Sequence, residues 1–86
     1  MASPTDLLIA IDAALAGDWH RAHGIVQQDE HNPMACWIHA VLHKIEGDAW
    51  NSRYWYARTP HSYGEWSDPR AELLAIRQAL SGSAPG

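Results

Sequence analysis

One predicted helical stretch carries four side chains that can bind a metal ion or transfer a proton. They are Cys36, His39, His43 and Glu46, separated by three, four and three residues. A helix places such positions along one side. Histidines at positions i and i+4 can share a divalent transition metal, and a carboxylate one turn later can be the third ligand. The spacing therefore indicates His39, His43 and Glu46 as candidate ligands of zinc or another divalent transition metal.

A structural role is the alternative for these histidines. They can be interior residues that hydrogen-bond to Tyr, Trp or backbone groups of neighbouring helices, because buried polar atoms need partners. Ala40 stands where zinc proteases have a Glu after the first His, so protease chemistry is not supported. His23 shares a predicted helix face with Trp19 and Val26, and is either a third imidazole of the site or a core residue.

A second group combines an amide, two amphipathic rings and a guanidinium on adjoining helical positions. These are Asn51, Tyr54, Trp55 and Arg58. The composition is typical of interaction hot spots and of pockets for small polar ligands. Alternatively, the rings seal the core and Arg58 pairs with Glu46 or Asp48.

Helix signals recur along the chain and define the elements that position these residues. Three dipeptides of a capping residue and proline begin at residues 3, 32 and 68, and two Gly-Asp turns begin at residues 17 and 47. The expected helices cover residues 4–16, 18–29, 33–46, 48–58 and 69–81, with a loop at 59–67.

Residues 33–46 are apolar over most of the helix circumference, which predicts a central helix with neighbours on both sides. Its core side should comprise Met34, Trp37, Ile38, Val41 and Ile45. Short turns favour antiparallel neighbours. We expect an all-α fold of five antiparallel helices in one domain, residues 1–80, followed by a disordered tail, residues 81–86.

The segments 14–22 and 42–52 resemble the Gly-Asp turns of tetratricopeptide repeats, with Ala22 and Ser52 at the small helix-packing position. The resemblance implies a short tetratricopeptide-like stack of helical hairpins. Thirty residues separate the two glycines, whereas the standard repeat has about 34. Residues 17–58 are also similar to a family of small bacterial proteins of unknown function, through the pattern GDWxxAH, WIHAxLHxxEGD and NxxYWYxR. That likeness implies a shared site without naming a reaction.

Charge and composition argue against several functions and compartments. The net charge is −4, with acidic residues concentrated in residues 1–30, so a nucleic-acid partner is not expected. Cys36 is the single cysteine, which fits a reducing cytoplasm. Neither a signal peptide nor a membrane-spanning segment is evident.

The leading expectation is a non-enzymatic binding module without a cofactor. Its polar-aromatic stripe on helices 33–46 and 48–58 would receive a peptide, a protein or a small polar ligand. One alternative is a metal-binding domain or small metalloenzyme. Another is a homodimer formed through the exposed aromatics of helix 48–58 or loop 59–67.

Overall fold

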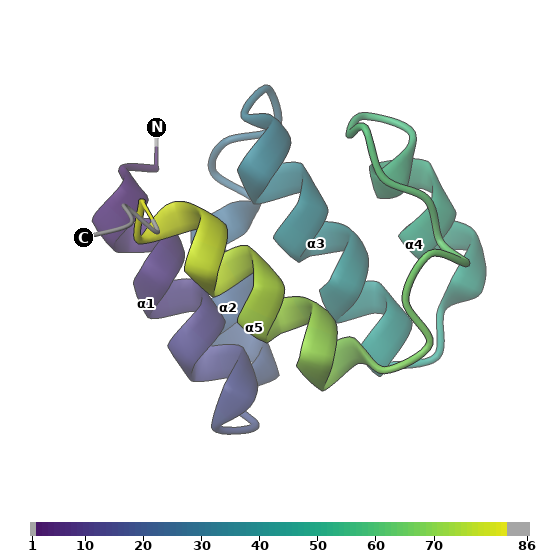
Figure 1. The fold of residues 1–86 in the computed structure, drawn as a ribbon, viewed down its shortest axis with the longest axis horizontal. Helices are drawn as coiled ribbons and strands as arrows, with labels where there is room; N and C mark the ends of the chain where they lie inside the picture. Colours follow the sequence, from purple (N-terminus) through teal and green to yellow (C-terminus); the bar gives the residue numbers. More distant parts are fainter. Residues whose placement is uncertain (1, 83–86) are drawn as a thin grey trace.

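The computed structural model describes residues 2–82, which form five α-helices and no strand, as Figure 1 shows. The helices are α1 (Pro4–Leu15), α2 (Trp19–Val26), α3 (Pro33–Ile45), α4 (Ala49–Tyr56) and α5 (Pro69–Leu80). The predicted all-α class is confirmed. Residues 83–86 of the expected disordered tail lie outside the described residues. No helix within residues 2–82 is both long and apolar enough to cross a membrane.

Local signals account for the helix boundaries. Each helix is capped by a side chain that accepts a hydrogen bond from a backbone N–H of the first turn; the capping residues are Ser3, Asp18, Asn32, Asp48 and Asp68. Gly17 and Gly47 adopt positive φ angles of 87° and 85°, as the turns between helices require. The largest difference from the prediction is the end of α2, three residues earlier than expected, where Gln28 and Asp29 form turns with i−3 hydrogen bonds.

The central position of α3 is confirmed, because this helix packs against all four others (Figure 1). Helix α1 packs against α2, α3 and α5, whereas the backbone of α4 packs on α3 alone among the helices described, and its Tyr56 side chain reaches Glu72 of α5. Within residues 2–82, α2 and α4 do not contact each other. The tetratricopeptide-like geometry of the two hairpins stays a prediction.

Of the residues expected in the core, Met34 is only partly buried and Ile45 is exposed. Ile45, at the last turn of α3, is 44% exposed. Its side chain lines a surface pocket of about 260 Å³ where α1 ends at Leu15 and α5 begins at Pro69. Neither neighbouring helix extends far enough to cover it. In contrast, Ile38 and Val41 are fully buried as predicted.

A buried carboxylate that sequence reasoning missed joins α3, α4 and α5. Glu72 is fully buried and accepts hydrogen bonds from Trp37 Nε1 at 2.8 Å, Tyr56 Oη at 2.6 Å and Lys44 Nζ at 2.9 Å. The ammonium of Lys44 compensates the charge of the carboxylate, and the neutral donors satisfy its remaining acceptor sites. The sequence feature that could have indicated its burial is the spacing of four residues to Ile76, which places both side chains on the same side of α5.

Candidate metal site

Three imidazoles from two helices converge in the structure. His23 comes from α2, and His39 and His43 lie one turn apart on α3. His39 and His43 are buried, with 4% and 7% exposure, whereas His23 is partly exposed. The packing of α2 against α3 therefore places His23 beside the pair, as its shared face with Trp19 predicted.

The cluster is close to the dimensions of a metal site. One nitrogen of each imidazole lies within 4.8 Å of the corresponding atoms of the other two. The ring centroids are 4.7 Å apart for His23 and His39, 5.0 Å for His39 and His43, and 5.4 Å for His23 and His43. Three nitrogens around a tetrahedral zinc ion are about 3.4 Å apart. Small adjustments of the side chains, on the order of 1 Å, would bring the nitrogens to that spacing.

Two indole rings hold the histidines from either side. Trp19 stacks on His23 at 4.6 Å with an interplanar angle of 11°, and Trp55 stacks on His39 at 3.9 Å and 14°. The indole of Trp19 is itself fixed, since its Nε1 donates a hydrogen bond to the carbonyl of Leu42 at 2.6 Å. These contacts restrict the rotation of the imidazoles and preorganise the cluster.

Glu46 lies behind His43 rather than beside His39. Glu46 Oε1 is 2.5 Å from His43 Nδ1. The potential ligand atoms grouped with the Glu46 carboxylate belong to His43 and Asp48, and not to His23 or His39. Of the two candidates for a third ligand, Glu46 and His23, the structure places His23 within reach of both His39 and His43. A carboxylate on Nδ1 leaves Nε2 of the same ring as the nitrogen for a metal.

Burial disfavours the charged forms of His23 and His39. Desolvation lowers the pKa of His39 to about 3, with further lowering by His23 and His43. Desolvation is also the largest cause that lowers the pKa of His23, followed by the nearby imidazole of His43. A metal binds the neutral imidazole, so at neutral pH His23 and His39 need not lose a proton before they coordinate.

Cys36 stands apart from the cluster although it shares the helical stripe. It is buried, and its Sγ donates a hydrogen bond to the carbonyl of Glu30 at 3.1 Å. Burial raises the pKa of the thiol, and a metal needs the thiolate. Cys36 therefore contributes packing and a local hydrogen bond.

The side chains of Asn51, Tyr54, Trp55 and Arg58 do not all contact the same part of the molecule. Trp55 faces the histidines, and Asn51 donates to the Asp48 carboxylate at 3.0 Å through Nδ2. Tyr54 is 44% exposed and accepts a hydrogen bond from Arg58 Nη2 at 2.7 Å. The alternative in which Arg58 pairs with Glu46 or Asp48 is thus not what the structure shows.

An exposed tryptophan next to this group was not predicted as a site residue. Trp50 is 74% exposed, and its ring lies parallel to Tyr54 at a centroid distance of 6.1 Å. Its position in the first turn of α4, where α4 has no helical neighbour besides α3, explains the exposure. The α4 surface formed by Trp50, Tyr54 and Arg58 is a second candidate binding region.

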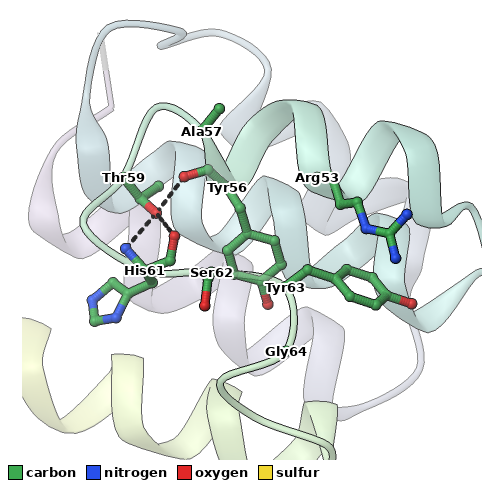
Figure 2. A pocket seen from close by; sticks show the side chains of 8 residues that line it. All are labelled: Arg53, Tyr56, Ala57, Thr59, His61, Ser62, Tyr63 and Gly64. Carbon is green, nitrogen blue, oxygen red and sulfur yellow. Dashed lines mark hydrogen bonds between the residues drawn. The ribbon is translucent and has the colours of Figure 1, made fainter.

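A pocket of about 530 Å³ lies between α4 and the loop that follows it (Figure 2). Arg53 and Tyr63 are at one end, with the guanidinium 4.8 Å from the ring centroid, and His61 is at the other. The Thr59 hydroxyl donates hydrogen bonds to the carbonyls of Tyr56 and His61 and accepts one from the His61 N–H. The pocket is separate from the imidazole cluster.

Comparisons with known proteins add no assignment. No protein-family model matches the sequence, and neither a curated protein nor a solved structure shows significant similarity to it. The similarity of residues 17–58 to a bacterial family accordingly stays a prediction. The geometry of the site is the basis for a proposed function.

Proposed function

We propose that the protein is a small metal-binding domain in which His23, His39 and His43 bind one divalent transition metal ion, with zinc as the best match. The observation that carries this proposal is the convergence of three imidazole nitrogens from α2 and α3 within 4.8 Å. Imidazole ligands suit zinc, copper and nickel, and zinc accepts three histidines in a tetrahedral site.

The surroundings of the cluster support the same proposal. A hydrogen-bonded carboxylate behind a ligating histidine orients the ring and raises its basicity. Glu46 occupies this position at His43. The stacked indoles of Trp19 and Trp55 exclude water from two sides, and an apolar surrounding strengthens the attraction between ligands and ion.

Zinc titration of the metal-free protein, followed by calorimetry and elemental analysis, tests the proposal. We expect one ion per chain and a rise in the midpoint of thermal unfolding. At a free zinc concentration 100 times Kd, the stabilisation is about 2.7 kcal/mol, or roughly 10 °C or more for a domain of this size. His23→Gln should reduce affinity at least tenfold, whereas His31→Gln, at an exposed position, should not. Equal affinity of both variants would refute the site.

A second candidate function is an interaction module that uses the α4 surface. The specific observation is the exposed pair of Trp50 and Tyr54, beside Arg58. Within residues 2–82, neither Arg53 nor Arg58 forms an ion pair with a carboxylate. Charge complementarity therefore favours a peptide with acidic side chains.

Selection from a random-peptide display library tests this second function. We expect enrichment of acidic peptides, and at least tenfold weaker binding of those peptides to the variant that combines Tyr54→Ala and Arg58→Ala. The matched control is Arg70→Ala, an exposed arginine at the start of α5. Peptides that bind the double variant and the wild type equally would exclude the α4 surface.

A further inference from the structure

We infer that a metal ion held by His23, His39 and His43 keeps one coordination position free of protein side chains, and that this position binds water or a small anion. The inference rests on the proposed metal-binding function and adds the class of ligand that the site takes. Zinc sites with four protein ligands are structural, whereas sites with three protein ligands and a water are open to exchange.

The cluster supplies three protein ligands, one fewer than a tetrahedral zinc ion takes. Among residues 2–82, the group of close ligand atoms around His39 contains the three imidazoles and no cysteine or carboxylate. Glu46 is engaged by His43 Nδ1, and Asp48 caps α4 by accepting from the backbone and side-chain amide of Asn51. A fourth ligand from these carboxylates would require the loss of these hydrogen bonds.

The walls of the cluster supply no further ligand. Both stacked side chains are indoles, which have an N–H donor and no lone pair for a metal. Trp19 Nε1 is directed to the carbonyl of Leu42. Cys36 remains a thiol with a hydrogen bond to the Glu30 carbonyl, and burial raises its pKa. The fourth ligand must therefore come from solvent.

Exposure of His23 indicates where solvent enters. Of the three imidazoles, His23 alone is partly exposed, and it lies on α2. Helices α2 and α4 both pack on α3 but, within the described residues, do not contact each other. Packing of these two helices against each other therefore does not close the side of the cluster between them.

Charge decides which ligand is favoured. Three neutral imidazole ligands leave the ion with its full double positive charge, and Glu46 contacts His43 through Nδ1, the nitrogen on the far side of the ring from the one left for the ion. An anion in the fourth position compensates this charge in surroundings that are mostly aromatic. Small anions such as azide or acetate have the required size and charge.

Cobalt substitution with an azide titration tests the inference. Co²⁺ loaded at one ion per chain should absorb in the visible region, and azide should shift this spectrum in a saturable way, because the anion enters the coordination sphere. The spectrum should lack the near-ultraviolet charge-transfer band of a cobalt–thiolate bond, and Cys36→Ser should bind azide like the wild type.

The possible results distinguish the open coordination position from the metal site itself. Stoichiometric cobalt binding with a spectrum that azide does not change would overturn the open position while leaving the metal site intact. A thiolate band that disappears in Cys36→Ser would also overturn it, because the thiol would then be the fourth ligand. Failure to bind cobalt or zinc at all would overturn both.

Discussion

The Nδ1 atom of His43 lies 2.5 Å from a carboxylate oxygen of Glu46, one turn away at the end of α3. This contact selects which ring nitrogen of His43 remains for a metal, since the nitrogen that faces the carboxylate is the one that donates. The exposure of the Glu46 side chain is 39%, compared with 9% for His43, so the carboxylate connects a buried imidazole to the surface.

Replacement of Glu46 by Gln should weaken zinc binding about tenfold or more, because an outer carboxylate orients and polarises the ligating ring. The fold should persist, since Glu46 is the C-cap of α3 and its side chain is partly exposed. Competition with a chromophoric chelator measures the change. Glu30→Gln, at an exposed residue, is the control, and an equal loss in both variants would contradict the role of Glu46.

The metal-free protein should lose stability as the pH falls below 6.5. His39 has a folded-state pKa of about 3, below the value of 6.5 for the unfolded chain, so acid protonates the unfolded state first. Between pH 7 and pH 5, this residue should account for about 2 kcal/mol of the lost free energy of unfolding. Urea denaturation at both pH values checks this. His39→Gln should show a smaller loss, and an unchanged loss would refute the assignment.

Removal of the buried carboxylate should destabilise the fold strongly. Glu72→Ala leaves Trp37 Nε1 and the Tyr56 hydroxyl without their acceptor and the Lys44 ammonium without its counter-ion, which should cost about 3–5 kcal/mol. Burial and the hydrogen bond to Glu72 raise the pKa of Tyr56, so its hydroxyl stays protonated as a donor. Urea denaturation measures the free energy of unfolding.

The matched control for that change is a carboxylate hydrogen-bonded to a histidine at the surface. Glu65→Ala removes a carboxylate that lies 3.2 Å from His61 with 43% exposure, and should cost less than about 1 kcal/mol. Comparable effects of Glu72→Ala and Glu65→Ala would show that the buried network contributes no special stability.

Two glycine substitutions should change stability in opposite directions. Gly24 lies within α2, and a Cβ atom there would meet no heavy atom within 4 Å, so Gly24→Ala should stabilise by about 0.5–1 kcal/mol. Gly47 has equal space but a φ of 85°, so Gly47→Ala should destabilise by about 1–2 kcal/mol. Thermal unfolding of both variants measures the difference, and changes of the same sign would contradict the backbone argument.

The sequence by itself determined the helices of this protein and the pairing of His39 with His43. Helix caps, Gly-Asp turns and i, i+4 spacing act within about four residues, so their effects do not depend on distant parts of the chain. The apolar circumference of residues 33–46 also determined which helix is central, because only a helix with several neighbours can bury so many sides.

Tertiary structure decided the rest of the site. Helical spacing alone puts Glu46 on the stripe of His39 and His43, but packing of α2 on α3 brings in His23, while Glu46 bonds to the far nitrogen of His43. Burial of Glu72 and exposure of Ile45 likewise depend on where α5 begins and which helices cover α3. Apart from the local contact of Glu46 with His43, these features depend on contacts between residues far apart in the chain, and the face that His23 shares with Trp19 indicated it only as one of two alternatives.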